Sequence, residues 1–302
     1  MIPTIDAHHH LWRYSEREYG WIGPDMGVLR RDFLEDDLVA LCREHRVDAT
    51  VVVQARQNLE ETDWLLSCAA GSETIAGVVG WFPLVSDELR GELEARLGAG
   101  SRLVGARHVV QDEPDPQFLL GREFNRGVKL LREYGLVYDV LVYERQLPAV
   151  LSFIDQHPDQ VFVIDHCAKP RIAEGALEPW GGYLQEVARR PQVFCKISGL
   201  ITEAGPEWEL STVRPFLDCV VEAFGTHRLM FGSDWPVCLL SGDYGRWSQT
   251  ARDYFAPFSP DEQRQVFAET ANTVYGLDWE ARWRASGHCD NSRSLSARRM
   301  TS

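Results

Sequence analysis

The chain has 302 residues, of which 44% are hydrophobic and 25% are charged, a composition typical of globular proteins. Its formal net charge of −14 argues against nucleic acid or an anionic membrane surface as a partner, because both require a basic face. The seven cysteines form no CxxC pair, and neither a secretory signal nor a membrane-length apolar run of ~18 residues is visible, so we expect a cytoplasmic protein.

Eight short apolar runs recur along the chain and are predicted to be β-strands. Most are continuous rather than alternating, which is typical of parallel strands buried on both faces. In chain order they are Thr4–His8, Ala49–Gln54, Ile75–Leu84, Leu103–Val110, Leu136–Val142, Val161–Asp165, Val193–Ile197 and Arg228–Gly232.

Amphipathic stretches lie between these runs and predict helices. Their apolar faces are formed by Leu34, Leu38 and Leu41; by Phe124, Val128 and Leu131; by Val150 and Ile154; by Tyr183 and Val187; and by Phe216, Val220 and Phe224. Eight strands alternating with helices favour a single-domain (β/α)₈ TIM barrel over residues 1–285. The Ser- and Arg-rich residues 286–302 are expected to form a disordered tail.

The strongest local motif is the histidine run at the end of the first predicted strand. Side chains alternate along a strand, so His8 and His10 point the same way and His9 points away. Two imidazoles at the C-terminal end of a barrel strand are well placed to bind one divalent ion. The alternatives are a polar cluster or a cloning scar, and a scar is disfavoured because the run sits inside a strand pattern.

A second motif, Phe231–Pro236, ends the eighth strand and contains Asp234. The eighth strand of a barrel closes against the first, so Asp234 is expected to face His8 and His10. A carboxylate there can take a proton from water and later pass it to a leaving group. The alternative is an Asp that caps a loop or helix, which the pairing with the two histidines disfavours.

His166 and Lys169 follow the sixth strand. His166 is predicted to be a third metal ligand or a hydrogen-bond donor to a substrate carbonyl, although a lone histidine is more often structural. Lys169 could neutralise a developing oxyanion or could simply be solvated.

Two cations stand inside apolar strands, Arg107 on the fourth and Lys196 on the seventh. Buried cations need partners, so they either pair with an aspartate below the site, namely Asp6, Asp139 or Asp165, or bind substrate. For Arg107 the ion pair is favoured over substrate binding. His108 is a further substrate-binding candidate, but it lies on the opposite face of the strand from Arg107.

Trp81 and Trp235 lie at or near strand ends, as does Trp180. Aromatic faces at such places suit the apolar face of a sugar ring, and packing is the alternative. Neither a GxSxG nucleophile motif nor a phosphate-binding Walker loop occurs.

Taken together, these motifs resemble the amidohydrolase superfamily in its amidohydrolase 2 branch, and within it the sugar lactonases of the L-fuconolactonase and L-rhamnonolactonase type. The resemblance runs in order over residues 3–280. The segments that carry it are Ile5–Trp12, Gly80–Leu84, Gly105–Pro114, Asp165–Pro170, Cys195–Leu200, Phe231–Val237 and Phe267–Leu277.

The resemblance implies a (β/α)₈ fold and the hydrolysis of a sugar-acid lactone. It maps His8, His10 and Asp234 onto the metal site and makes Asp234 and His166 catalytic. The fifth strand carries Asp139 where a second metal would need His or Lys, so at most one divalent ion, zinc, is expected. A metal-free site is the alternative, because some related lactonases in this branch work without an ion.

The expected mechanism has the lactone carbonyl polarised by an ion on His8, His10 and Asp234, or by His166 and Lys169 without one. Asp234 then activates water and later protonates the ring oxygen. Two rival functions are a metal-dependent decarboxylase, disfavoured by Asp139, and a sugar-binding barrel without turnover. The expected partner is a small-molecule sugar lactone, and a homo-oligomer is left open.

Overall fold

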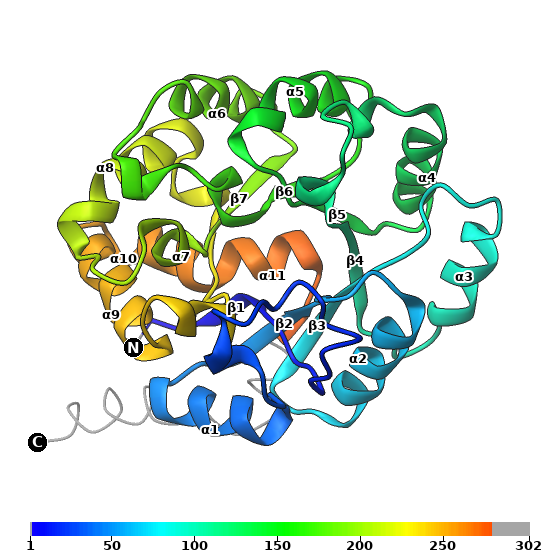
Figure 1. The fold of residues 1–302 in the computed structure, drawn as a ribbon, viewed down its shortest axis with the longest axis horizontal. Coiled ribbons are helices and arrows are strands. Elements are labelled where there is room, and N and C mark those ends of the chain that lie inside the picture. Colours follow the sequence, from blue (N-terminus) through cyan, green and yellow to red (C-terminus); the bar gives the residue numbers. More distant parts are fainter. Residues whose placement is uncertain (1, 280–302) are drawn as a thin grey trace, which may run out of the picture.

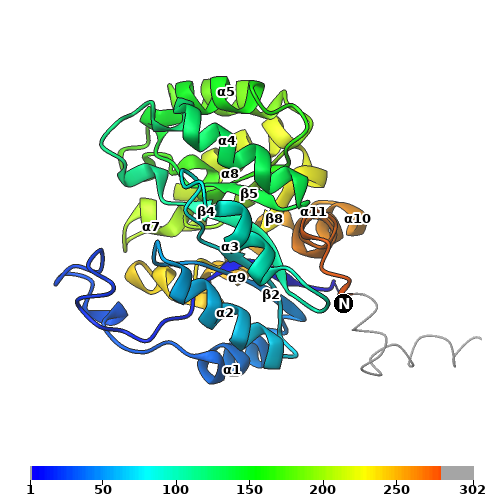
Figure 2. The ribbon, with the colours of Figure 1, turned by 90° about the vertical axis from the view of Figure 1, so that its right-hand side faces the viewer.

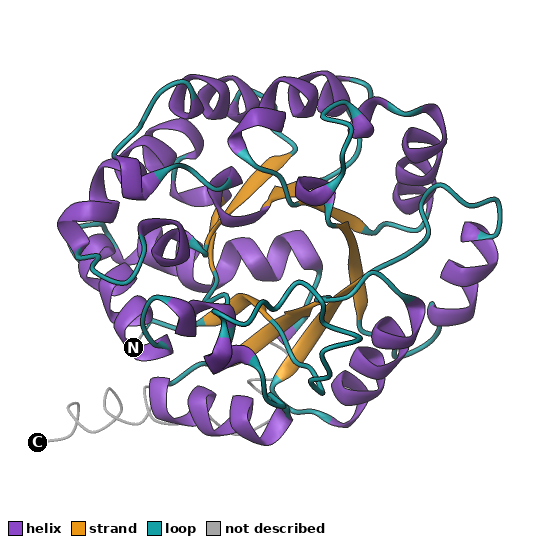
Figure 3. Ribbon diagram, in the orientation of Figure 1, coloured by secondary structure: helices purple, strands orange, loops and turns teal. Residues whose placement is uncertain are grey.

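The computed structural model describes residues 2–279, which form one eight-stranded parallel sheet with the strands in sequence order (Figure 1). Helices surround the sheet on the outside (Figure 3). The predicted (β/α)₈ barrel and all eight predicted strands are therefore confirmed. The strands are β1 Ile5–His9, β2 Ala49–Val53, β3 Ile75–Gly80, β4 Leu103–His108, β5 Val137–Val140, β6 Phe162–Ile164, β7 Val193–Ile197 and β8 Leu229–Phe231.

The five predicted helices correspond to α1, α4, α5, α6 and α8. The helices in order are α1 Glu35–His45, α2 Leu59–Gly71, α3 Leu89–Arg96, α4 Arg122–Glu133, α5 Leu147–Asp155, α6 Trp180–Ala188, α7 Leu200–Ala204, α8 Leu210–Phe224, α9 Tyr244–Phe255, α10 Pro260–Arg264 and α11 Thr270–Tyr275. Short 3₁₀ turns that matter for the site are η5 Asp165–Ala168, η6 Ile172–Glu174 and η8 Val237–Leu240.

The barrel closes through the segment that follows β8. The amide of His10 donates to the carbonyl of Trp235 at 2.7 Å, and the amide of Asp234 donates to the carbonyl of His8 at 2.8 Å. The hydrogen bonds that join the first strand to the end of the last therefore involve the same residues that the sequence singles out for chemistry.

The lower half of the barrel interior is filled by apolar side chains and sealed by α11. Ile5, Ala7 and Met230 pack with Ala271 and Tyr275 of this helix. In Figure 1 α11 crosses the middle of the barrel, and in Figure 2 it lies on the same side as the N-terminus. The open end of the barrel is therefore the opposite one, at the C-terminal ends of the strands.

Within residues 2–279 no helix is both long and apolar enough to cross a membrane. The six cysteines in this part of the chain are free thiols. The predicted tail over residues 286–302 and the domain boundary at residue 285 lie outside the described residues.

Candidate active site

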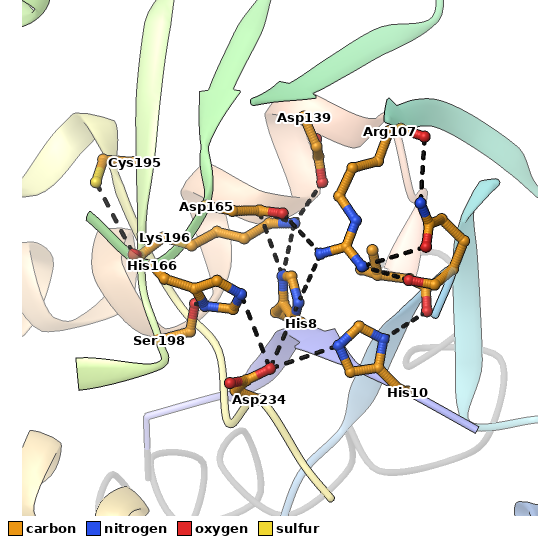
Figure 4. A network of polar contacts seen from close by, with 12 residues as sticks. His8, His10, Arg107, Asp139, Asp165, His166, Cys195, Lys196, Ser198 and Asp234 are labelled. Atoms are coloured by element: carbon orange, nitrogen blue, oxygen red, sulfur yellow. Dashed lines mark hydrogen bonds and ion pairs between the residues drawn. The ribbon is translucent and has the colours of Figure 1, made fainter. Parts of the chain in front are cut away.

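Four side chains converge at the C-terminal end of the barrel: His8 from β1, His10 from the residue directly after β1, His166 from the turn after β6, and Asp234 from the turn after β8 (Figure 4). The Oδ1 atom of Asp234 lies 3.5 Å from Nε2 of His10, 3.7 Å from Nε2 of His8 and 3.9 Å from Nε2 of His166. All four residues are at most 5% exposed. Residues from opposite ends of the chain thus form one cluster.

A β-bulge aims the two histidines of β1. Ile5 and Ala7 face the apolar barrel interior, so strict alternation would put His9 inside and His8 outside. The register between β1 and β2 instead shifts between Asp6 and His9, which is an extra residue in β1. His8 therefore turns inward, and His9 points outward, where its Nε2 lies 3.0 Å from Oγ1 of Thr50.

The backbone partner of His10 fixes its tautomer. Its Nδ1 atom lies 2.8 Å from the carbonyl oxygen of Val53, which can only accept, so Nδ1 carries a proton. The other ring nitrogen, Nε2, faces Asp234 at 3.5 Å. A histidine held this way presents one nitrogen to a metal ion or a water molecule.

His8 is held among three buried charged groups. Its Nδ1 atom lies 3.3 Å from Oδ1 of Asp165 and 3.2 Å from Nζ of Lys196, and its Nε2 atom lies 3.4 Å from a guanidinium nitrogen of Arg107. Burial holds the pKa of His8 well below 6.5, so the ring is neutral. A proton on Nδ1 would satisfy Asp165 and leave the lone pair of Nε2 to Arg107, whose guanidinium only donates, whereas Lys196 favours the opposite arrangement.

Asp234 is ionised despite its burial. Burial raises the pKa of a carboxyl group, but His166, His10 and Lys169 facing it outweigh burial and hold the pKa of Asp234 below 3.8. The residue has a φ of 58°, in the left-handed region, and its amide is bonded to His8. Its carboxylate is thus fixed in position and available to accept a proton.

His166 stands on an unusual backbone turn. The four residues from His166 to Lys169 all have φ between 50° and 58°, a left-handed turn that costs about 1–2 kcal/mol per residue. Nδ1 of His166 lies 2.9 Å from Oγ of Ser198. A Cβ at Gly199 would lie 2.6 Å from that same nitrogen, so only glycine leaves room for the ring. Burial lowers the pKa of His166 to about 4, so it is neutral near pH 7.

A fully buried ionic network supports the cluster from below. Nζ of Lys196 contacts Asp139 and lies 3.0 Å from Oδ1 of Asp165. Arg107 donates to Oδ2 of Asp165 at 3.0 Å, and the hydroxyl of Tyr275 donates to Asp139 at 2.8 Å. The expected pairing of Arg107 and Lys196 with buried aspartates is therefore found, with Asp139 and Asp165 as the partners. Asp6 instead accepts from Ser233 and Tyr244.

Of the remaining predicted substrate contacts, Lys169 and Trp81 are half-buried and Trp235 is buried. Lys169 is half-buried, and its charge acts on both His166 and Asp234. Trp81 is half-buried, and its buried indole nitrogen has no hydrogen-bond partner within the described part of the chain. Trp235 is 3% exposed and packs edge-on against Phe33.

His108 lies apart from the cluster, and this corrects its expected place at the substrate. Its Nε2 atom lies 2.6 Å from Oε1 of Glu113, and its ring stacks on Phe118 with the centroids 5.0 Å apart. The ring also meets Phe124 of α4 edge-on, so it packs between β4 and the outer helix. The alternation that turns Arg107 inward necessarily turns His108 outward.

Two supporting residues were not singled out from the sequence. Ser198 follows Lys196 by two positions and shares its inward face, so the alternation of β7 could have revealed it. Tyr275 carries no local signal, because α11 reaches the site only through the folded topology.

Within residues 2–279, two groups of side chains could hold a metal ion: His8, His10 and Asp234, or His8, Asp165 and His166, each with its ligand atoms within 4.8 Å of one another. Asp165 is already neutralised by Lys196 and Arg107, which disfavours the second group. In the first, two imidazole nitrogens and a carboxylate oxygen face one another. These are the donor atoms that zinc prefers, so this group fits a single ion.

The sequence profile of the family described as amidohydrolase matches residues 5–277. The chain belongs to the amidohydrolase family. It is 41% identical to an L-fucono-1,5-lactonase of Burkholderia multivorans, with 90% of this chain and 96% of that protein covered. It is 37% identical to an L-fucono-1,5-lactonase of Burkholderia ambifaria, with 92% and 97% covered. The resemblance seen in the motifs is thereby confirmed.

A solved structure agrees over the same span. The crystal structure of an amidohydrolase from Burkholderia multivorans with bound zinc is 42% identical and superimposes with a TM-score of 0.87, covering 91% of this chain and 99% of that one. The fold that places His8, His10 and Asp234 together is thus shared with a protein that holds zinc.

Proposed function

We propose that this amidohydrolase opens a sugar-acid lactone to the free acid, with Asp234 as the base that activates water. The observation that carries the proposal is the ionised, buried carboxylate of Asp234 facing the two imidazole nitrogens of His8 and His10. The likeness to two L-fucono-1,5-lactonases over nine-tenths of the chain supports the substrate class.

His8, His10 and Asp234 are the residues that would hold one divalent ion, for which zinc is the proposed identity because the solved relative holds it. When bound, such an ion supplies Lewis acidity to the lactone carbonyl and lowers the pKa of water. Asp139 is engaged by Lys196 and Tyr275, so no second ion is proposed.

Asp234 performs the proton transfers. Its pKa lies below 3.8, so it is unprotonated at neutral pH and can take a proton from water as the water oxygen bonds to the lactone carbonyl carbon. As the bond from that carbon to the ring oxygen breaks, the same proton passes to the ring oxygen. The carboxylate is restored, and one water has been consumed for each lactone opened.

His166 and Lys169 are proposed to stabilise the oxyanion that forms during attack. The hydroxyl of Ser198 can donate to Nδ1 of His166, which leaves the proton of the neutral ring on Nε2, facing the same space as Asp234. Lys169 adds a positive charge near this point. Donors fixed before the reaction stabilise developing charge without reorganisation.

Among the expected substrate contacts, Trp81 and Lys169 remain proposed. Trp235 is also retained, as a wall beside Asp234, since it is the next residue in the chain. Arg107 is 3% exposed and engaged by Asp165, so we propose that it positions Asp165 and His8 rather than touching substrate.

A pH-indicator screen of aldonolactones, with and without a chelator, tests the proposal. Acid release from a 1,5-lactone of a sugar acid is expected, and a rate lost on chelation and restored by zinc would support the metal. Release of carbon dioxide from an unsaturated acid without lactone turnover would favour a decarboxylase. Binding of lactones without any acid release would favour a sugar-binding barrel.

A further inference from the structure

The short helix α7 lies at the C-terminal mouth of the barrel. It begins two residues after Ser198, and it packs against η6, which follows the turn that carries Lys169, and against η8, which follows Asp234. In Figure 2 α7 lies on the side of the molecule opposite the N-terminus. Its side chains are therefore candidates for contact with a substrate bound above Asp234.

Glu203 of α7 is an acidic side chain in this position that the proposed chemistry does not use. It is half-buried, and within residues 2–279 its carboxyl group forms neither a hydrogen bond nor an ion pair. It is close enough to Asp234 and Lys169 for their charges to act on it in opposite directions. Burial, aided by Asp234, raises the pKa of Glu203, while Lys169 lowers it.

An ammonium group and a phenol accompany Glu203 at this end of the barrel. Nζ of Lys169 lies 5.2 Å from the ring centroid of half-buried Tyr143, and Glu203 acts electrostatically on both residues. A carboxylate with free lone pairs beside an ammonium and a phenol suits neither an apolar ligand nor a free anion, because two carboxylates, Asp234 and Glu203, would repel the anion. It suits a neutral molecule that carries several hydroxyl groups, each both donor and acceptor.

We infer that Glu203 is a specificity-determining residue that accepts hydrogen bonds from the hydroxyl groups of a sugar-acid lactone, with Lys169 and Tyr143 completing the subsite. This inference rests on the proposed lactonase function and extends it. A buried acceptor matched to a hydroxyl discriminates against a substrate without one, since the acceptor would be left desolvated and unpaired.

The test compares Glu203→Gln and Glu203→Ala with the wild type on two substrates, a hydroxylated aldono-1,5-lactone and δ-valerolactone, which has the same ring without hydroxyls. Glu207→Gln is the matched control, because Glu207 lies four residues further on and is exposed. For Glu203→Ala, kcat/KM is expected to fall by about 10- to 100-fold on the aldonolactone, mainly through KM, and by less than about threefold on δ-valerolactone. Glu203→Gln should show a smaller loss in the same direction, because its amide oxygen still accepts.

The test distinguishes a failure of the inference about Glu203 from a failure of the proposed lactonase function. Equal losses on both lactones would overturn the inference, because Glu203 would then act on Asp234 or on folding rather than on hydroxyl groups. Unchanged kinetics on both would overturn it as well. In either case wild-type lactone turnover leaves the proposed function standing, whereas a wild-type protein that opens neither lactone overturns the function and this inference together.

Discussion

Replacing Lys196 with methionine would remove the only ammonium group that contacts both Asp139 and Asp165 within the described residues. All three side chains are fully buried, so water cannot replace the lost partner. Breaking a buried ion pair from one side typically costs about 3–5 kcal/mol of unfolding free energy. Arg107 still pairs with Asp165 and Tyr275 still donates to Asp139, so we expect the lower end, about 3 kcal/mol.

The unfolding free energy lost in Lys196→Met should depend on pH. Burial already raises the pKa of Asp139 to about 6, and Lys196 opposes that effect, so its loss must raise the pKa further. A raised folded-state pKa means that a carboxyl group favours folding below its unfolded-state pKa and that this contribution is lost as pH rises through the folded-state value. Lys196→Met should therefore be far more destabilised at pH 8 than at pH 5.

Urea unfolding of the wild type and Lys196→Met at pH 5 and pH 8, followed by circular dichroism, measures this effect. Lys196→Met/Asp139→Asn is the matched control, since it removes the uncompensated charge, and it should regain part of the stability at pH 8. If Lys196→Met lost less than about 1 kcal/mol of unfolding free energy at pH 8, or lost the same amount at both pH values, the reasoning would be refuted. Lys196 and its aspartates would then not behave as charged, desolvated partners.

Three further predictions follow from the site. His10→Gln should lose bound metal while His9→Gln retains it, as measured by elemental analysis of the purified proteins; equal metal content in both would argue against the first ligand group. Because the pKa of Asp234 lies below 3.8 and that of His166 is about 4, kcat/KM should be flat from pH 5 to 8 and fall only near pH 4, and an acid limb near pH 6.5 would contradict this assignment. Gly199→Ala places a Cβ against His166 at a φ of 68° and should cost about 1–3 kcal/mol and at least tenfold in kcat, whereas wild-type kcat would show that the position of His166 is not critical.

The barrel could be predicted from the sequence because its strands are continuous apolar runs, a pattern that holds wherever both faces of a sheet are buried. The pairing of Arg107 and Lys196 with buried aspartates was equally predictable, since a cation inside such a strand requires an acceptor. His108 shows that a position near a strand end does not suffice to predict a substrate contact. Its side chain pairs instead with Glu113, five residues further along the chain.

The local backbone of the site could not be predicted. The bulge in β1 turns His8 inward, against the alternation that Ile5 and Ala7 establish. It is visible only in the register between β1 and β2, which a single strand's sequence does not contain. The left-handed turn from His166 to Lys169 opposes the intrinsic preference of every residue in it. Such strain is tolerated only when the surrounding fold enforces it, so no local pattern reports it.

The most direct test of the central claim is the turnover of an aldono-1,5-lactone by Asp234→Asn, compared with Asp253→Asn, which makes the same change on the exposed side of α9. The amide cannot accept a proton from water, so kcat should fall by about 10²–10⁴-fold in Asp234→Asn, with an unchanged circular dichroism spectrum. Asp253→Asn should retain full turnover. Substantial turnover by folded Asp234→Asn would contradict the assignment of Asp234 as the base.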